Sequence, residues 1–304
     1  MKKLLLTGAF KYSREQLNKL ERLGYEIVFV QDERKALNND VSDIDAVVCN
    51  SLFNYNDIKE FKNLRIIQLT SAGLDRVPLD RITEQGIRLF NARGVYSIPM
   101  AEWVILKILE IYKKSRVFYK NQEQHKWEKH RDLLELTDKT AVIIGYGSVG
   151  AEIAKRLKVF GVNVISVDRQ IREDDYVDEY ILIDDLDTAL VKSDIIILSL
   201  PLTDETRHLI NKDRINLMKA NVVLINVSRG GIIDETDLIE SLRGDKFLGV
   251  ALDVFEEEPL NESLLWDFEN VIITPHNSFV SDKMNERLFE LMVENLNIET
   301  EVFE

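Results

Sequence analysis

The sequence predicts an α/β protein with two doubly wound domains, each built on a parallel sheet. Short, β-rich apolar runs alternate with longer helical stretches, which is typical of a parallel sheet covered by helices on both faces. This alternating series occurs twice along the chain. A length of 304 residues also suits two domains of roughly 150 residues each.

The first series begins close to the N-terminus. Ser13 is a plausible N-cap for a helix over Ser13–Leu23. The expected strands are Leu4–Thr7, Glu26–Val30, Ala46–Cys49, Arg65–Leu69 and Ile87–Phe90.

A long helical segment, from about Pro99 to Gln124, separates the two series. Proline suits the first turn of a helix, where its missing N–H has no intrahelical partner to lose. Such a helix is long enough to link two domains and to bury one face against a partner subunit. Its broad apolar face consists of Ala101, Val104, Ile105, Ile108, Leu109 and Ile111.

The second series contains a helix expected at Val149–Phe160 and ends in a helix at about Ser281–Leu296. That last helix could return to pack on the first domain. The expected strands are Ala141–Ile144, Val162–Val167, Ile195–Leu200, Val222–Asn226, Gly249–Leu252 and Val271–Thr274.

Composition excludes several classes of function. The net charge of −14 argues against nucleic acid or an anionic membrane as partner, because both need a basic surface. No apolar run approaches the roughly 20 residues of a membrane span. The single cysteine, Cys49, lies in an apolar run and is expected to be buried and inert, which fits a reducing cytoplasm. A local arginine could still hold a small anionic substrate.

The turn Gly145-Tyr146-Gly147-Ser148-Val149-Gly150 is the most informative motif. It follows a buried strand, opens a helix, and is followed eighteen residues later by Asp168 at a strand end. This context favours a dinucleotide site over a glycine turn without a ligand. Gly145 would allow the tight turn, Gly147 a close approach to the pyrophosphate, and Gly150 close packing of helix on strand. The helix N-terminus would offer N–H groups to the phosphates.

Asp168 favours NAD over NADP as the cofactor. Its carboxylate should accept hydrogen bonds from the ribose hydroxyls, and it would repel a 2′-phosphate. The adjacent Arg169 weakens this preference, since an arginine can pair with such a phosphate.

Arg229, Glu258 and His276 each follow a predicted strand, where open α/β sheets bind their ligands. Reduction of a 2-keto acid needs a cation for the carboxylate and an acid that protonates the oxygen as hydride arrives at carbon. Arginine suits the first role and histidine the second. A glutamate beside the imidazole would favour its protonated form and fix its orientation. In the oxidation direction, His276 would act as the base.

Structural interpretations of these residues stay open. His276 could cap a helix or lie in the core, Arg229 could form a surface ion pair, and Glu258 lies in an acidic run that is usually a solvated loop. Asp253 could hydrogen-bond the cofactor, which we favour, or merely end a strand. No cluster has zinc-ligand spacing, so no metal is expected. Surface positions are expected for His125, His130 and His208.

Together these segments resemble the D-isomer-specific 2-hydroxyacid dehydrogenase family over nearly the whole chain. The most specific parts are Gly145–Gly150, Asn226–Asp234, Asp253–Leu260 and Thr274–His276. The likeness is to hydroxypyruvate and glyoxylate reductases and to phosphoglycerate dehydrogenases, in a short form without a regulatory domain. It implies hydride transfer between NAD(H) and a small D-2-hydroxy acid or its 2-keto acid, without specifying which acid.

The resemblance also implies an organisation and a set of contacts. Residues 1–97 plus 281–304 would form a discontinuous, flavodoxin-like substrate domain, and residues 98–280 a Rossmann dinucleotide-binding domain. A homodimer through the cofactor domains is implied. Arg229, Glu258 and His276 would form the catalytic set, with Asp253 near the nicotinamide. Further implied contacts are Leu200, Pro201, Thr206, Val227 and Ser228 to the cofactor, and Ser71, Ala72 and Gly73 to the substrate carboxylate.

Two other functions occur on this scaffold. An NAD-sensing corepressor that binds peptides is the principal alternative, because the intact Arg229, Glu258 and His276 do not exclude it. Formate dehydrogenase is disfavoured, because those relatives carry glutamine where this chain has Glu258.

Overall fold

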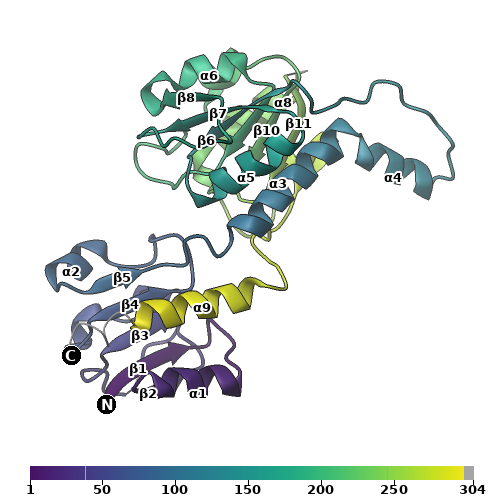
Figure 1. Cartoon of the computed structure of the whole chain (residues 1–304). Helices are drawn as coiled ribbons and strands as arrows, with labels where there is room; N and C mark the ends of the chain where they lie inside the picture. Colours follow the sequence, from purple (N-terminus) through teal and green to yellow (C-terminus); the bar gives the residue numbers. More distant parts are fainter. Residues whose placement is uncertain (38, 245, 298–304) are drawn as a thin grey trace. The chain divides into compact units, whose positions relative to one another are not determined.

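The computed structural model describes residues 1–37, 39–244 and 246–297. The chain divides into two compact units: unit 1 comprises Met1–Tyr96 and Ser281–Glu304, and unit 2 comprises Ser97–Val280. Each unit contains one sheet, and every pairing between the named strands is parallel (Figure 1). The predicted α/β fold class is therefore confirmed.

Unit 1 has a five-stranded sheet in the order β2-β1-β3-β4-β5, which is the flavodoxin-like arrangement. Buried apolar side chains cover both faces of the sheet, with α1 and α9 on one face. The elements are β1 Lys2–Thr7, α1 Arg14–Arg22, β2 Tyr25–Val30, β3 Ala46–Cys49, β4 Ile66–Leu69, α2 Leu79–Glu84, β5 Arg88–Phe90 and α9 Met284–Asn297, with short 3₁₀ turns at Leu52–Asn54 and Ile58–Glu60.

Local sequence signals explain where the first helix starts. The hydroxyl of Ser13 accepts a hydrogen bond from the backbone N–H of Gln16, and the side chain of Gln16 accepts one from the backbone N–H of Ser13. This reciprocal capping box satisfies two donors that the helix cannot pair internally. The expected N-cap at Ser13 is confirmed.

Helix α9 completes unit 1 although it comes from the other end of the sequence. The side-chain amide of Asn295 donates to Oε1 of Gln68 at 2.7 Å, and both side chains are buried. The hydroxyl of Tyr25 donates to the carbonyl of Leu296 at 3.1 Å. Two long-range hydrogen bonds thus fix the helix against β2 and β4.

Unit 2 has a seven-stranded sheet in the order β12-β11-β10-β9-β6-β7-β8. Six of these strands, from β8 to β11, follow the Rossmann order 3-2-1-4-5-6, and β12 adds a seventh. The strands are β6 Thr140–Ile144, β7 Asn163–Asp168, β8 Glu179–Leu182, β9 Ile195–Leu198, β10 Val222–Asn226, β11 Phe247–Leu252 and β12 Val271–Ile273.

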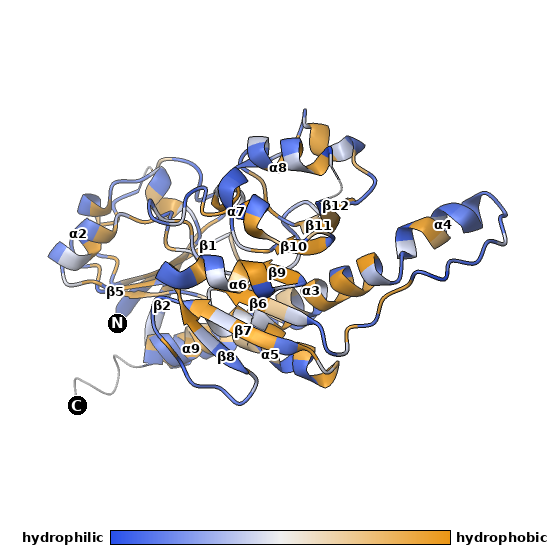
Figure 2. Ribbon diagram, turned by 90° about the horizontal axis from the view of Figure 1, so that it is seen from above, coloured by the Kyte–Doolittle hydropathy of each residue, from blue (hydrophilic) through white to orange (hydrophobic). Residues whose placement is uncertain are grey.

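Helices cover both faces of this sheet, and Figure 2 shows how apolar its central strands are. One buried cluster packs α3 and α5 on the sheet, and a second packs α6, α7 and α8 on the other face. Such strands read as continuous apolar runs because both faces are covered. The helices are α3 Ser97–Tyr112, α4 Ser115–Glu123, α5 Ser148–Val159, α6 Leu186–Lys192, α7 Lys212–Leu217 and α8 Glu235–Leu242, with 3₁₀ turns at Ile183–Asp185, Gly230–Ile232 and Leu264–Asp267.

The expected single helix from Pro99 to Gln124 is wrong, because the structure contains two helices. Lys114 adopts a left-handed backbone conformation with φ of 52° between α3 and α4. Beyond this break, Arg116 donates to the carbonyls of Glu269 and Val271, which gives α4 a direction of its own. Helix α4 and the chain that returns from it project away from the seven-stranded sheet (Figure 1).

Within the described ranges, no helix is both long enough and apolar enough to cross a membrane. Cys49 is fully buried in β3, and burial raises the pKa of its thiol above the ordinary range.

Candidate active site

The glycine turn connects β6 to α5, next to the point where the strand order of unit 2 reverses between β6 and β9. Gly145 has φ of 92°, and a Cβ there would lie 2.6 Å from three atoms of Leu200, so only glycine fits. A Cβ on Gly150 would lie 2.8 Å from the carbonyl oxygen of Gly145. Around Gly147 nothing lies within 4 Å of such a carbon. The turn is thus tightly packed at Gly145 and Gly150 but has open space at Gly147. This arrangement fits a binding site for a phosphate at the N-terminus of α5.

Asp168 ends β7 and contacts this turn directly. One carboxylate oxygen accepts a hydrogen bond from the backbone N–H of Tyr146 at 2.8 Å, and the other accepts one from Arg169 N–H at 2.7 Å. The side chain of Tyr146 is buried, so this residue presents mainly its backbone to the turn. Ser148 and Val149 form the first turn of α5.

The loop after β9 lies on the other side of the crossover. Leu200 is buried against Gly145, whereas Pro201 is exposed. The hydroxyl of Thr206 donates to the carbonyl of Pro201 at 2.8 Å and accepts from the backbone N–H of Thr203 at 2.7 Å. The loop is therefore closed on itself by hydrogen bonds.

Arg229 follows β10, one residue after a buried polar turn. The side-chain oxygen of Asn226 accepts hydrogen bonds from both the backbone N–H and the hydroxyl of Ser228, at 3.0 and 2.7 Å. The side-chain amide of Asn226 donates to the carbonyl of Arg229 at 3.0 Å. Ser228 and Val227 are buried, so the strand end holds the backbone of Arg229 firmly.

Glu258 and His276 come together as a direct pair. Nδ1 of His276 lies 2.8 Å from Oε2 of Glu258, and the two side chains are each 37% exposed. The other oxygen of Glu258 accepts from the backbone N–H of Phe255 at 3.1 Å. A carboxylate that is fixed at both oxygens orients the imidazole and favours a proton on Nδ1. Both residues lie beyond the carboxyl ends of their strands, β11 and β12.

Asp253 lies at the end of β11 and is fully buried. Its carboxylate accepts hydrogen bonds from the hydroxyl of Thr274 and from the backbone N–H groups of Asn277, at 2.8 Å, and Ser278, at 2.9 Å. The carbonyl of Asp253 accepts from the backbone N–H of His276 at 2.8 Å. Its side chain thus binds the turn that carries His276, so the cofactor contact expected from the sequence stays a prediction.

The turn of His276 has an unusual backbone conformation. The φ of His276 is 50°, a left-handed value that few non-glycine residues adopt. The hydrogen bonds that the Asp253 carboxylate accepts from Thr274 and Asn277, on either side of His276, offset the cost of that conformation.

The loop with Ser71, Ala72 and Gly73 belongs to unit 1. Its carbonyls accept hydrogen bonds: Ala72 from the side chain of Asn91 at 2.7 Å, and Gly73 from the hydroxyl of Ser71 at 3.1 Å. Ala72 is exposed. Two carbonyl oxygens of this loop are therefore hydrogen-bonded within the unit. That the loop binds the substrate carboxylate stays a prediction.

Two residues of this region were not singled out from the sequence. His208, expected as a surface residue, contacts Glu256 and Asp234. Glu235 accepts from the backbone N–H of Glu256 at 2.6 Å, and burial, followed by the charges of Glu256 and Glu258, raises its pKa. His208 and Glu256 are 48 positions apart, so spacing carried no signal of their contact.

The chain is similar to known proteins over most of its length. Residues 105–278 match the NAD-binding domain of the D-isomer specific 2-hydroxyacid dehydrogenases. The chain is 38% identical to a hydroxypyruvate reductase of Thermotoga maritima, over 72% of either chain. A crystal structure of D-lactate dehydrogenase from Aquifex aeolicus, complexed with NAD and lactic acid, has a TM-score of 0.79 and 26% identity, over 98% of this chain and 95% of the other.

A longer relative is also similar. The chain is 31% identical to a D-3-phosphoglycerate dehydrogenase of Methanocaldococcus jannaschii, over 97% of this chain but only 57% of that protein. The chain therefore spans little more than half the length of that relative. From these matches and from the fold, the chain belongs to the D-isomer-specific 2-hydroxyacid dehydrogenase family.

Proposed function

We propose that this chain transfers hydride between NAD(H) and a small D-2-hydroxy acid or its 2-keto acid. The observation that carries the proposal is the Glu258–His276 pair, which lies at the same sheet edge as the glycine turn. In the reducing direction, a 2-keto acid, NADH and one proton give the 2-hydroxy acid and NAD⁺. The relatives named as hydroxypyruvate reductase and D-lactate dehydrogenase support this class of substrate.

The residues fit a dinucleotide. The open space at Gly147 and the N–H groups at the start of α5 would hold the pyrophosphate, and Asp168 would accept from a ribose hydroxyl. The bound nicotinamide would supply the hydride. A negative carboxylate at Asp168 favours NAD over NADP, because it would repel a 2′-phosphate.

The side chains of unit 2 would supply the rest of the chemistry. His276 would donate its Nε2 proton to the carbonyl oxygen of the keto acid, and Glu258 would stabilise the imidazolium from the opposite nitrogen. Arg229 would hold the substrate carboxylate, because a guanidinium pairs with it bidentately and keeps its charge.

Steady-state kinetics test this function. NADH oxidation should be measured against a panel of small 2-keto acids, including hydroxypyruvate, glyoxylate and pyruvate. His276→Gln should lower kcat by about 100-fold or more for any acid that is turned over, while NADH binding persists. Binding of NADH by the wild-type chain without turnover of any acid would contradict the proposal and would favour an NAD-sensing binding protein.

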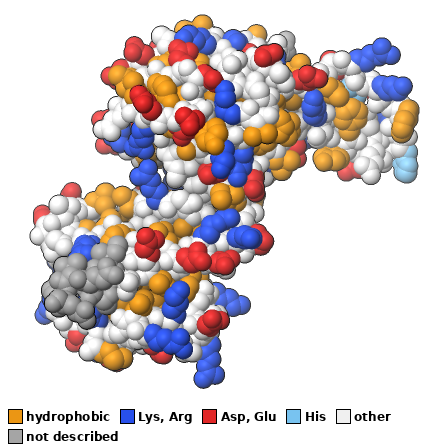
Figure 3. All heavy atoms as spheres, viewed as in Figure 1, with side chains coloured by type: hydrophobic (Ala, Val, Ile, Leu, Met, Phe, Trp, Pro, Cys, Tyr) orange, Lys and Arg blue, Asp and Glu red, His pale blue; other side chains and the backbone are white. Residues whose placement is uncertain are grey.

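We also propose that residues 113–131, which we call the arm, bind a second copy of the chain. Tyr119 is 60% exposed and Trp127 is 94% exposed, which is unusual for large aromatic side chains. Figure 3 shows hydrophobic and basic side chains side by side on the arm. The arm has seven lysines and arginines against two glutamates, whereas the whole chain has a net charge of −14. This complementarity favours a second copy as the occupant.

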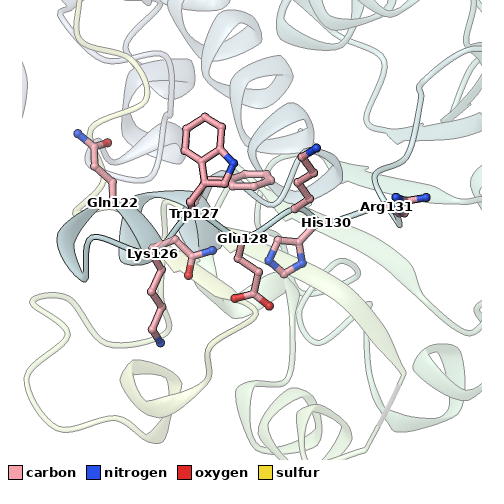
Figure 4. A pocket seen from close by; sticks show the side chains of 9 residues that line it. Gln122, Lys126, Trp127, Glu128, His130 and Arg131 are labelled. Atoms are coloured by element: carbon pink, nitrogen blue, oxygen red, sulfur yellow. The ribbon is translucent and has the colours of Figure 1, made fainter.

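The arm also lines an open hollow of about 870 Å³ that a partner could enter (Figure 4). Its labelled lining residues are Gln122, Lys126, Trp127, Glu128, His130 and Arg131. Sedimentation velocity should show a dimer that Trp127→Ser weakens by at least about tenfold in Kd, the scale of a central aromatic anchor. A wild-type chain that sediments as a monomer at every concentration would contradict this proposal.

A further inference from the structure

Two of the three loops that carry proposed catalytic residues of unit 2 approach each other closely. The loop after β10, residues 227–234, carries Arg229, and the loop after β11, residues 253–260, carries Glu258. A Cβ on Gly230 in the first loop would lie 1.8 Å from the carbonyl carbon of Phe255 in the second. The position of Glu258 therefore depends on the contacts between these two loops.

His208 contacts both loops. Its Nε2 lies 2.7 Å from Oε1 of Glu256 in the second loop, and its Nδ1 lies 3.5 Å from Oδ2 of Asp234 in the first. Its backbone N–H donates to the carbonyl of Gly231 at 2.8 Å. One residue outside both loops thus bridges them through its ring and its backbone.

The acidity of this region explains why such a bridge is needed. The side chain of Glu235 accepts a hydrogen bond from the backbone N–H of Glu256 at 2.6 Å, and Glu258 is two positions further along the chain. Burial first, and then the charges of Glu256 and Glu258, raise the pKa of Glu235. Carboxylates this close repel one another, so the second loop needs a donor that offsets the repulsion. His208 supplies that donor to Glu256.

A short series of contacts connects the His208–Glu256 pair to His276, the proposed acid. Within the second loop, Glu258 accepts from the backbone N–H of Phe255 at 3.1 Å, directly beside Glu256. The other oxygen of Glu258 lies 2.8 Å from Nδ1 of His276. A shift of Glu256 would therefore move the carboxylate that orients the imidazole.

We propose that His208 is a positioning residue, which holds the loop of Glu258 to the loop of Arg229 and so sets the geometry of the Glu258–His276 pair. The proposal rests on the function proposed above. His208 takes no direct part in any chemical step of the reaction. It acts through Glu256, and its effect on turnover depends on that contact.

The backbone of His208 makes a sharp test possible. Its φ is 50°, a conformation that asparagine adopts more readily than glutamine. Asparagine would place its amide near the position of Nδ1 and lose the contact with Glu256. Glutamine would place its amide near the position of Nε2 and keep that contact. If the only role of His208 were to adopt this backbone conformation, His208→Asn would be the milder change. The proposal instead requires His208→Gln to be the milder change.

Kinetics give the first readout. With a 2-keto acid that is turned over, His208→Asn should lower kcat by about 10- to 100-fold, since small misplacements of catalytic groups have effects of this size. His208→Gln should stay within about threefold of the wild type, and KM for NADH should be unchanged in both. Glu256→Ala should reproduce the loss without altering the backbone at position 208. Glu257→Ala, an equal change of charge at an exposed neighbour, should keep the wild-type kcat.

A readout that needs no turnover separates this proposal from the proposed function. The chain has four histidines, so ¹⁵N-histidine spectra are simple, and His276→Gln assigns the downfield Nδ1–H signal of the Glu258 pair. This signal should persist in His208→Gln and be lost or broadened by exchange in His208→Asn and Glu256→Ala. Its persistence in both of the latter, in folded protein, would overturn the proposal. Its loss would support the positioning role even if no 2-keto acid were reduced.

Discussion

Gly230 allows the geometry of the two loops to be tested by a single methyl group. In Gly230→Ala, the added carbon would lie 1.8 Å from the carbonyl carbon of Phe255, 2.1 Å from its oxygen and 2.2 Å from the nitrogen of Glu256. These atoms all belong to the backbone, so no rotation of a side chain relieves the overlap. The loops would have to separate by roughly 1.7 Å before the distance of 1.8 Å reached an ordinary contact of about 3.5 Å.

That separation sets the size of the expected effect. A displacement on the order of 1 Å in the supporting structure lowers catalysis by roughly 100-fold, which we expect here in kcat/KM for the 2-keto acid. Overpacking of this kind also lowers the free energy of unfolding by about 1–3 kcal/mol. The affinity for NADH should change less than kcat/KM, because the glycine turn and Asp168 belong to other loops and only Val227 and Ser228, among the expected cofactor contacts, share the loop of Gly230. Stopped-flow and steady-state kinetics, NADH fluorescence titration and urea unfolding measure these quantities.

Two other glycines provide matched controls. A Cβ on Gly231 would meet only the ends of the Arg207 and Leu202 side chains at 3.3 Å, and one on Gly244 would have its nearest neighbour at 3.8 Å. Gly244→Ala should therefore behave as the wild type, and Gly231→Ala should show a small loss. If Gly230→Ala were as active and as stable as Gly244→Ala, the reasoning from loop proximity would be refuted.

Three further predictions concern single side chains. The pKa of Glu235 is raised, chiefly by burial, so its carboxyl group keeps its proton to a higher pH in the folded chain than in the unfolded chain. Loss of this proton therefore destabilises the fold as the pH rises above the ordinary pKa of 4.5. Glu235→Gln should thus unfold at higher urea than the wild type at about pH 8, and equal denaturation midpoints there would contradict this; the difference should vanish below about pH 4.5. Asp168→Ala removes a charged acceptor and should weaken NADH binding by about 10- to 100-fold, with less effect on NADPH; fluorescence titrations that show an equal loss for both would argue against a ribose contact. Arg229→Lys should raise KM for the keto acid by about tenfold or more, and an unchanged KM would remove Arg229 from the carboxylate.

The strands of unit 2 were largely predictable from the sequence, because buried parallel strands read as apolar runs. Strand β10 was predicted at its observed bounds, Val222–Asn226, and its residues are all buried. Strand β8, Glu179–Leu182, was missed because this edge strand is only partly buried and begins with a charged residue. The apolar pattern is therefore too weak in β8 to predict a strand.

The break between α3 and α4 could not be predicted in the same way. No glycine or proline marks Lys114, and the helical pattern continues past it. The contacts that direct α4 are long-range, from Arg116 to carbonyls more than 150 positions away. Tertiary hydrogen bonds of this kind override local helix propensity.

The site shows a similar division. Spacing after strands was enough to single out Glu258 and His276, and the structure brings these two into contact. The hydrogen bonds that the Asp253 carboxylate accepts from the turn of His276 were not predicted, because an aspartate at a strand end suits a cofactor contact equally well. The contact between His208 and Glu256 was not predicted because, taken singly, each residue is typical of a solvated loop.

The hydrogen bond between Gln68 and Asn295 has a consequence for biosynthesis. These side chains lie in one core, yet 227 positions separate them in the chain. A ribosome makes the strands of unit 1 first and α9 only after all of unit 2 has been made. Until then, the apolar surface that Phe289 and Met292 later cover is exposed to solvent. The nascent chain therefore carries an unfinished core for most of its synthesis, and that surface is where a chaperone would bind it.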